Sequence, residues 1–279
     1  MPHDPGAPLT GRSVVITRTL GQSRKLAEPL EALGAEVLAM PVLEVTDPPD
    51  PGAVDAAIAQ LATYDWLVLT STNAVDRFFA RLVFTDRTGE ALTHVRIAAV
   101  GKATAAHLRE KGVTPDLVPD EARAEGLVAA FRVRGVGAGC HILLPRALVA
   151  REVLPDKLRA MGAHVDVVPV YQTKAVDPDP AVLGRLRDGT VDAVTFTSGA
   201  IARAFVSAVR EAGLDPDSVL GRVAIASIGP VTTDELGALG YEADIEAPKA
   251  TMAALAQAVA EKLGARVSSS AEPQEQGGV

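Results

Sequence analysis

An internal repeat limits the folds open to this chain of 279 residues more than any other feature. The stretch VVITRTLGQSRKLAEPLEALGAEVLAMPVLEV at 14–45 is matched by ILLPRALVAREVLPDKLRAMGAHVDVVPVYQT at 142–173. Four residue pairs follow nearly the same spacing: Arg18 with Arg146, Pro41 with Pro169 and Gly101 with Gly229 at an offset of 128, and Ser71 with Ser198 at 127. Because solenoid repeats are only about 20 to 50 residues long, this period indicates a duplicated domain.

Within each half, short β-branched runs alternate with helical periodicity, which is typical of βαβ units and parallel sheets. Strands are predicted near 14–18, 36–40, 66–70, 95–100 and 116–118, and again near 141–145, 165–168, 192–197, 223–228 and 243–246. Helices are predicted near 22–33, 53–62, 73–82, 102–111 and 124–132, and near 150–161, 180–187, 200–211, 230–239 and 250–263. The repeat therefore predicts an α/β fold with two flavodoxin-like parallel-sheet domains.

Pro41 and Pro169 each interrupt a strand-like run, and proline inside a central strand removes a ladder hydrogen bond. Each run is therefore expected to break at its proline, where the chain leaves one domain, and the segments that follow are expected to pair as a two-stranded β linker. The predicted organisation is a discontinuous first domain (1–41 plus 176–265), a second domain (46–168), linker strands (42–45 and 169–175) and a disordered polar tail (266–279). A sequential split near residue 138 is the alternative.

Composition and charge argue against several classes of protein. Cys140 is the only cysteine and the five histidines lack metal-ligand spacing, so neither a metal site nor an intramolecular disulfide is expected. The 27 basic and 35 acidic residues give a net charge of −8, which argues against sequence-independent binding to nucleic acid or to an anionic membrane. Without an apolar run of about 20 residues or a signal peptide at the start, a soluble cytoplasmic protein is expected.

The repeated motifs TSTNA and TSGAI, and GKAT and GPVTT, lie where a strand leads into a helix, which is where parallel sheets bind ligands. Backbone N–H groups and the helix dipole favour anions at such turns. The candidate binding residues in these loops are Ser71, Thr72, Gly101, Lys102, Thr104, Ser198, Gly229 and Thr232. Ordinary helix capping is the alternative for any single loop, but four loops in paired positions favour an anion site.

Three further side chains complete the candidate set. Arg18 and Arg146 end the first strand of each half, where an arginine can clamp a carboxylate, or can simply be solvated. Tyr171 follows Pro169 and is either a core side chain or a hydrogen-bond donor and general acid that faces a cleft between the domains. The GVGAG loop at 135–139 precedes a strand, and neither GxxxxGK[ST] nor GxSxG occurs, so no nucleotide cofactor is expected.

The order of these motifs resembles the bacterial uroporphyrinogen-III synthase family, from about residue 11 to 264, and VYQT, VGKAT and SIGPVTTDEL are its most specific pieces. The resemblance implies a lyase that cyclises hydroxymethylbilane to uroporphyrinogen III with loss of water and inversion of ring D, in tetrapyrrole (heme, siroheme, cobalamin) biosynthesis. It also implies a monomer that needs no cofactor, and substrate handover from hydroxymethylbilane synthase.

The same resemblance implies residue roles. Loss of the hydroxyl gives an azafulvene cation, the terminal ring closes through a spiro intermediate, and the enzyme's main task is to hold the substrate in a folded conformation. Tyr171 matches the family's VYQT tyrosine and is expected to assist loss of the hydroxyl, while Thr104 and Thr232 match positions that resemble cleft-facing hydroxyls. Ser71 and Ser198 are carried over from the paired TS loops. A non-enzymatic module that binds a small anion without turnover is the alternative class.

Overall fold

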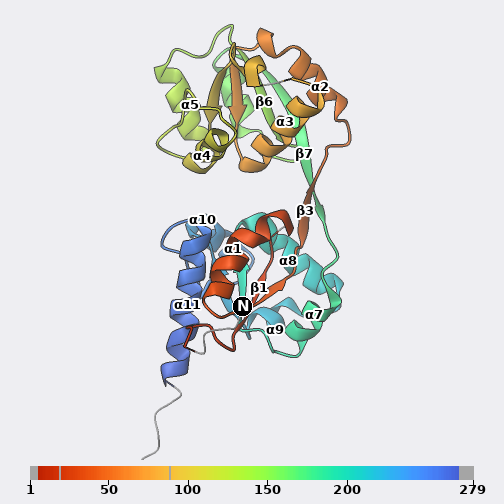
Figure 1. Ribbon diagram of the computed structural model, residues 1–279. Helices are drawn as coiled ribbons and strands as arrows, with labels where there is room; N and C mark the ends of the chain where they lie inside the picture. The colour runs from red at the N-terminus through yellow and green to blue at the C-terminus, as the bar shows by residue number, and fades with distance from the viewer. Residues whose placement is uncertain (1–5, 19, 88, 270–279) are drawn as a thin grey trace, which may run out of the picture. The chain divides into compact units, whose positions relative to one another are not determined.

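The structure is a computed structural model that describes residues 6–18, 20–87 and 89–269 (Figure 1). The chain forms two compact units, of which unit 1 comprises Met1–Glu44 and Lys174–Val279 and unit 2 comprises Val45–Thr173. Each unit contains one five-stranded sheet. The two ends of the chain therefore build unit 1, and its middle builds unit 2.

Unit 1 combines strands from both halves of the repeat, in the order β10-β9-β8-β1-β2, and the neighbouring strands pair in parallel. Its elements are β1 (Ser13–Ile16), α1 (Leu20–Ala32), β2 (Glu36–Ala39), α7 (Pro180–Arg187), β8 (Ala193–Phe196), α8 (Gly199–Glu211), α9 (Pro216–Leu220), β9 (Ala224–Ser227), α10 (Pro230–Ala238), β10 (Ile245–Glu246) and α11 (Met252–Ser269).

Unit 2 has the sheet order β3-β7-β6-β4-β5, with parallel pairing of β7, β6, β4 and β5. Its elements are β3 (Leu43–Thr46), α2 (Gly52–Ala59), η1 (Leu61–Thr63), β4 (Trp66–Leu69), α3 (Thr72–Phe84), η2 (Gly89–Leu92), β5 (Arg96–Ala99), α4 (Lys102–Glu110), α5 (Ala124–Val133), β6 (His141–Ala147), α6 (Val153–Ala160) and β7 (His164–Ala175). The neighbouring strands β3 and β7 both carry the chain from one unit to the other (Figure 1).

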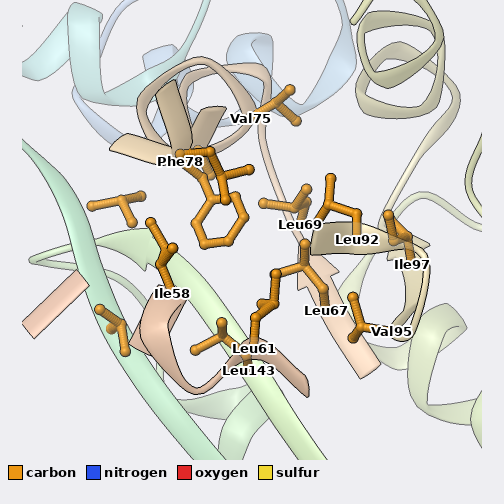
Figure 2. Close-up of a cluster of buried hydrophobic side chains, with 14 of the residues drawn as sticks. Ile58, Leu61, Leu67, Leu69, Val75, Phe78, Leu92, Val95, Ile97 and Leu143 are labelled. Carbon is orange, nitrogen blue, oxygen red and sulfur yellow. The ribbon is translucent and has the colours of Figure 1, made fainter. Parts of the chain in front are cut away.

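Each sheet has a hydrophobic core cluster on both of its faces. Successive side chains of a strand point to opposite faces and so enter different clusters. In β4, Leu67 and Leu69 enter a core cluster with Phe78 of α3, which Figure 2 shows. Trp66 and Val68 enter a second cluster, in which the Trp66 and Phe131 rings pack edge to face with their centroids 5.0 Å apart. A sheet buried on both faces explains why WLVL reads as a continuous apolar run.

The strand order of each unit reverses at one point, and this point places the site. In unit 2, the connection through α6 leads from β6 to β7, its neighbour in one direction along the sheet. The connection through α3 leads from β4 to β5, its neighbour in the opposite direction. The reversal therefore lies between β6 and β4, and the equivalent reversal in unit 1 lies between β1 and β8. In open parallel sheets, ligands bind beyond the carboxyl ends of the strands at such a point.

The prediction of an α/β fold with two parallel sheets is confirmed. The proline prediction is right for the first run, since β2 ends at Ala39 and β3 begins at Leu43. It is wrong for Pro169, through which β7 runs unbroken. The register with β6 shifts directly after Pro169, from Arg146–Pro169 to Ala147–Tyr171, so a bulge accommodates the residue that lacks an N–H group.

Two further predictions need correction. The strand predicted at 116–118 is reduced to one isolated bridge between Leu117 and Ala98. Prolines at 115 and 119 flank this segment, and their missing N–H groups leave little of a ladder to form. The tail predicted for 266–279 overlaps α11, which ends at Ser269, and its remaining residues, 270–279, lie outside the described residues.

Candidate functional site

The paired serines of the TS loops cap the helices that follow them. Ser71 Oγ accepts a hydrogen bond from the Ala74 N–H group at 3.1 Å, and Ser198 Oγ accepts one from Ile201 N–H at 3.3 Å. Both serines have extended backbone angles, as N-cap residues do. Capping is therefore a real function of both side chains, and each keeps its own hydroxyl proton for a further acceptor.

Ser71 differs from Ser198 because it also meets Tyr171. Tyr171 lies on β7 opposite Ala147, the last residue of β6, and its Oη atom is 3.3 Å from Ser71 Oγ. Since Ser71 Oγ already accepts from Ala74, it can donate to the phenol oxygen and leave the phenolic proton for another acceptor. The distance exceeds the usual O–H···O length of about 2.8 Å, as is common for catalytic hydrogen bonds before substrate binds.

The other two tyrosines of the chain are held by carboxylates. Tyr64 donates to Asp166 at 2.7 Å, and burial together with that carboxylate raises the pKa of Tyr64. Tyr241 donates to Asp217 at 2.8 Å, and burial and Asp217 raise the pKa of Tyr241 to about 12. Tyr171 instead meets a neutral hydroxyl at the end of the sheet where ligands bind. The Tyr171 side chain is 8% exposed and belongs to the core cluster around Phe78, so its role as a proton donor to a substrate stays a prediction.

The paired glycines begin α4 and α10 for different physical reasons. Gly229 has φ +157, a conformation that side chains rarely adopt, while a Cβ atom there would have space, with Ala250 Cβ 3.9 Å away. Gly101 has an extended backbone that any residue adopts, but a Cβ atom there would lie 2.8 Å from Ala122 Cβ. Both positions therefore require glycine at a helix start, which brings backbone N–H groups close to any ligand.

The other loop candidates differ in exposure. Thr104 and Thr232 are buried, at 5% and 4% exposure, so their role as cleft-facing hydroxyls stays a prediction. Lys102 is exposed at the first position of α4, and Thr72 is half-buried at the first position of α3. Of these residues, Lys102 presents a charge to solvent at the carboxyl end of unit 2's sheet.

The two arginines predicted to clamp carboxylates are both engaged within the protein. Arg146 is 8% exposed, donates from Nη1 to the Arg151 carbonyl at 2.9 Å and pairs through Nη2 with Glu152. Arg18 is partly buried, its Nη1 lies 3.1 Å from Met252 Sδ, and burial lowers its pKa. Arg146 therefore anchors the loop after β6, a role that its position at a strand end did not reveal.

Other polar contacts at the strand ends were missed by the sequence analysis. Thr17 Oγ1 donates to the Thr195 carbonyl at 2.6 Å, and Thr195 Oγ1 donates to the Val15 carbonyl at 3.0 Å, so two buried threonines join β1 to β8 at the reversal point. In the GPVTT loop, Thr233 rather than Thr232 forms the side-chain contact, with Ser227 Oγ 2.7 Å away. Thr17 in ITR and Thr195 in VTF, each at the end of an apolar run, were the available signal.

The described part of the chain has neither a metal-binding cluster nor a membrane-spanning helix. Within 6–18, 20–87 and 89–269, no group of three or more His, Cys, Asp or Glu side chains could hold a metal ion. Over the same residues, no helix has the length and apolar character needed to cross a membrane.

Comparison with known proteins gives consistent matches. The family model described as uroporphyrinogen-III synthase HemD matches residues 24–257. A uroporphyrinogen-III synthase from Synechococcus elongatus is 36% identical over 256 residues, which cover 90% of this chain and 96% of that protein. A putative uroporphyrinogen-III synthase from Methanothermobacter thermautotrophicus is 31% identical, over 82% of this chain and 90% of its own.

Solved structures match in fold. A mutant uroporphyrinogen III synthase from the extremely thermophilic bacterium Thermus thermophilus aligns with a TM-score of 0.62 at 19% identity, and the match covers 91% of this chain and 99% of that one. A uroporphyrinogen-III synthetase from Helicobacter pylori aligns with a TM-score of 0.57 at 17% identity, over 90% and 99% of the two chains. At these identities the likeness shows the fold.

Proposed function

The chain belongs to the uroporphyrinogen-III synthase family of cyclising lyases, whose members cyclise hydroxymethylbilane in tetrapyrrole biosynthesis, and from this premise we propose how its residues perform the reaction. The linear tetrapyrrole loses water and closes to uroporphyrinogen III with ring D inverted, on the route to heme, siroheme and cobalamin. The observation that carries the proposal is the contact between Tyr171 and Ser71 at the carboxyl end of unit 2's sheet.

Tyr171 acts as the general acid for the first step. The bond between the terminal methylene carbon and its hydroxyl oxygen breaks, the oxygen takes the phenolic proton, and water leaves. The lone pair of the pyrrole nitrogen supplies the electrons and gives an azafulvene cation. Ser71 donates to the phenol oxygen and stabilises the negative charge that develops there. The substituted α carbon of ring D then attacks the terminal methylene carbon and gives the spiro intermediate. The bond from that α carbon to the methylene of ring C breaks, and the free α carbon of ring D bonds to the released methylene, which inverts the ring. The free α carbon loses its hydrogen in this closure and the proton returns to the phenolate, so the protons balance.

The helix starts serve to hold the substrate. Its eight carboxylates need donors in fixed positions, and the beginnings of α3, α4, α8 and α10 offer backbone N–H groups with favourable dipoles. Gly101 and Gly229 let a ligand approach the backbone at α4 and α10, and Lys102 adds a cation beside Gly101. Because the azafulvene also closes spontaneously to the unrearranged isomer I, the orientation of the reacting rings decides the product.

The remaining features of the proposal concern the whole chain. We propose that the two units correspond to separate domains, with the boundaries predicted from the repeat. The chain acts as a cytoplasmic monomer on a small-molecule substrate, without a resident cofactor, and receives that substrate from hydroxymethylbilane synthase. Sedimentation at working concentration checks the monomer, and a mass above that of one chain would contradict it.

Comparison of Tyr171→Phe with the wild type on freshly generated hydroxymethylbilane tests the role of the phenol. We expect kcat to fall about tenfold, less than the 10²–10⁴-fold typical of general acids, because this hydroxyl leaves easily. Tyr241→Phe is the matched control, since it removes a phenol of unit 1 that Asp217 holds. A Tyr171→Phe enzyme that is folded and as fast as the control would refute the role of general acid.

A further inference from the structure

Unit 2 contains a cavity of about 330 Å³ at the carboxyl ends of its strands. Thr70 and Val100 line it from the ends of β4 and β5, Leu144 and Arg146 line it from β6, and Arg123 and Arg151 line it from the loops before α5 and α6. The cavity therefore opens beside the point where the strand order of this sheet reverses. Ligand pockets span about 300 to 1,000 Å³, so this one suits part of a large ligand.

Neither Tyr171 nor Ser71 lines the cavity, but the chain links the cavity to this pair at two points. Thr70, on its wall, directly precedes Ser71. The loop that follows β6 begins with Leu148, whose N–H group donates to the Tyr171 carbonyl at 2.8 Å. The chain segments that shape the cavity are thus bonded to the segments that carry the proposed acid.

Arg146, in the wall of the cavity, has a buried hydrogen-bond donor without an acceptor among the described residues. The Nε atom of Arg146 is buried and has no hydrogen-bond partner within the described part of the chain, although both terminal nitrogens of this guanidinium are engaged. A buried donor without a partner costs about 1–3 kcal/mol, which an incoming acceptor would recover. Arg123, Arg146 and Arg151 line the cavity together with one acidic residue, Glu125. Arg123 also pairs with Glu121 at 2.7 Å and Arg146 with Glu152, both outside the lining, so an anionic ligand would share these guanidinium groups with carboxylates of the protein.

The rest of the cavity is apolar. Leu144, Leu154 and Val100 contribute to its wall. Val153, the first residue of α6, also lines it and is 38% exposed, and Val149, in the loop before α6, is 87% exposed. Exposed large apolar side chains beside a cavity of this kind indicate a ligand with an apolar body. The cavity therefore combines an apolar surface with arginines at its edge.

We infer that this cavity is a subsite that receives one pyrrole ring of the tetrapyrrole, with a carboxylate arm of that ring directed to Arg123, Arg151 and the Arg146 Nε atom. A pyrrole ring with acetate and propionate arms has the required flat apolar body and anionic ends. The subsite rests on the proposed function and deepens it, because it holds one ring while the Tyr171 phenol acts beside it.

The test uses a charge-matched pair of double variants. Arg123→Gln/Arg151→Gln removes two cavity arginines, and Arg132→Gln/Arg134→Gln removes two exposed arginines at the end of α5, in the same unit. We expect the cavity variant to raise KM for hydroxymethylbilane on the order of tenfold, or about 1.4 kcal/mol, with kcat within threefold. The α5 variant should keep the wild-type KM within twofold.

A single-ring probe reads the subsite without turnover. We expect a monopyrrole that carries acetate and propionate groups to bind the wild type in calorimetric titration and to inhibit it competitively. Val153→Trp, which fills the mouth of the cavity without a change of charge, should weaken that binding on the order of tenfold, and the α5 variant should not. Thermal unfolding of each variant confirms that it is folded.

The outcomes separate the subsite from the function. Equal KM values and equal monopyrrole affinities in the cavity and α5 variants would overturn the subsite, even with a fully active wild type. A wild type that makes no isomer III would refute the proposed function, on which the subsite rests. The monopyrrole titration would then still show whether the cavity binds such a ring.

Discussion

The paired serines allow a prediction in which stability and catalysis separate. Ser71 and Ser198 occupy equivalent positions in the repeat and cap α3 and α8 with hydrogen bonds of 3.1 and 3.3 Å. Replacing an N-cap serine by alanine costs about 1 kcal/mol. For units of this size, the melting temperature should therefore fall by about 4 °C in Ser71→Ala and in Ser198→Ala alike, measured by calorimetry.

Catalysis should distinguish the two serines, because Ser71 alone of the pair meets Tyr171, at 3.3 Å. A neutral hydrogen bond contributes about 1 kcal/mol, and this one is long, so we expect a coupling of about 0.5–1 kcal/mol between Ser71→Ala and Tyr171→Phe. The kcat of the Ser71→Ala/Tyr171→Phe double variant should therefore be about two- to fivefold higher than the value obtained by multiplying the fractional kcat losses of the two single variants. The Ser198→Ala/Tyr171→Phe pair should be additive.

Steady-state kcat of all five variants and the wild type, on freshly generated hydroxymethylbilane, completes both cycles. If Ser71→Ala and Tyr171→Phe are additive within error, the serine does not assist the phenol, and its function is capping alone. Equal coupling in both cycles would also refute the reasoning, because the expected coupling comes from the hydrogen bond between Ser71 and Tyr171, in which Ser198 has no part.

Two further predictions concern stability. Gly229→Ala forces alanine into φ +157, which costs about 1–3 kcal/mol and is offset by about 0.4–1 kcal/mol from the unfolded chain, so its melting temperature should fall by several degrees, and a stabilised variant would contradict the strain. Burial alone would raise the pKa of Asp76, but hydrogen bonds from His107 and Lys111 lower it. This carboxylate therefore stabilises the fold above its unfolded pKa of about 4, and the contribution is lost as the pH falls through the lower folded pKa. The difference in melting temperature between wild type and Asp76→Asn should shrink in that acidic range, and a difference independent of pH would refute the contribution.

The repeat made most of the fold predictable, because apolar strands and paired loop motifs recur at one offset. The failures have local causes. Pro169 stays inside β7 because a bulge with β6 accommodates it, and bulges leave no clear mark in a single sequence. Leu117 forms only an isolated bridge because prolines flank its segment. These prolines are visible in the sequence and argue against a strand, but the expectation of five strands in each half outweighed them.

The site was predictable in its loops but not in its contacts. Ser71 and Tyr171 were both candidates, yet nothing in the sequence shows that two residues 100 positions apart meet. Arg146 at a strand end could clamp a ligand or be buried, and its partner Glu152 decides the question only once the loop is folded. Arg123 lies outside the repeated stretches and Arg151 has Ser23 as its counterpart in the first copy, so only the cavity singles them out.

The most direct test of the central claim is the isomer composition of the product. The protein is added in increasing amounts to freshly generated hydroxymethylbilane, the products are oxidised, and porphyrin isomers I and III are separated by chromatography, with heat-unfolded protein as the control. We predict that isomer III predominates and that its share rises with the amount of folded protein. Isomer I alone, formed at the spontaneous rate in the presence of folded protein, would contradict the account.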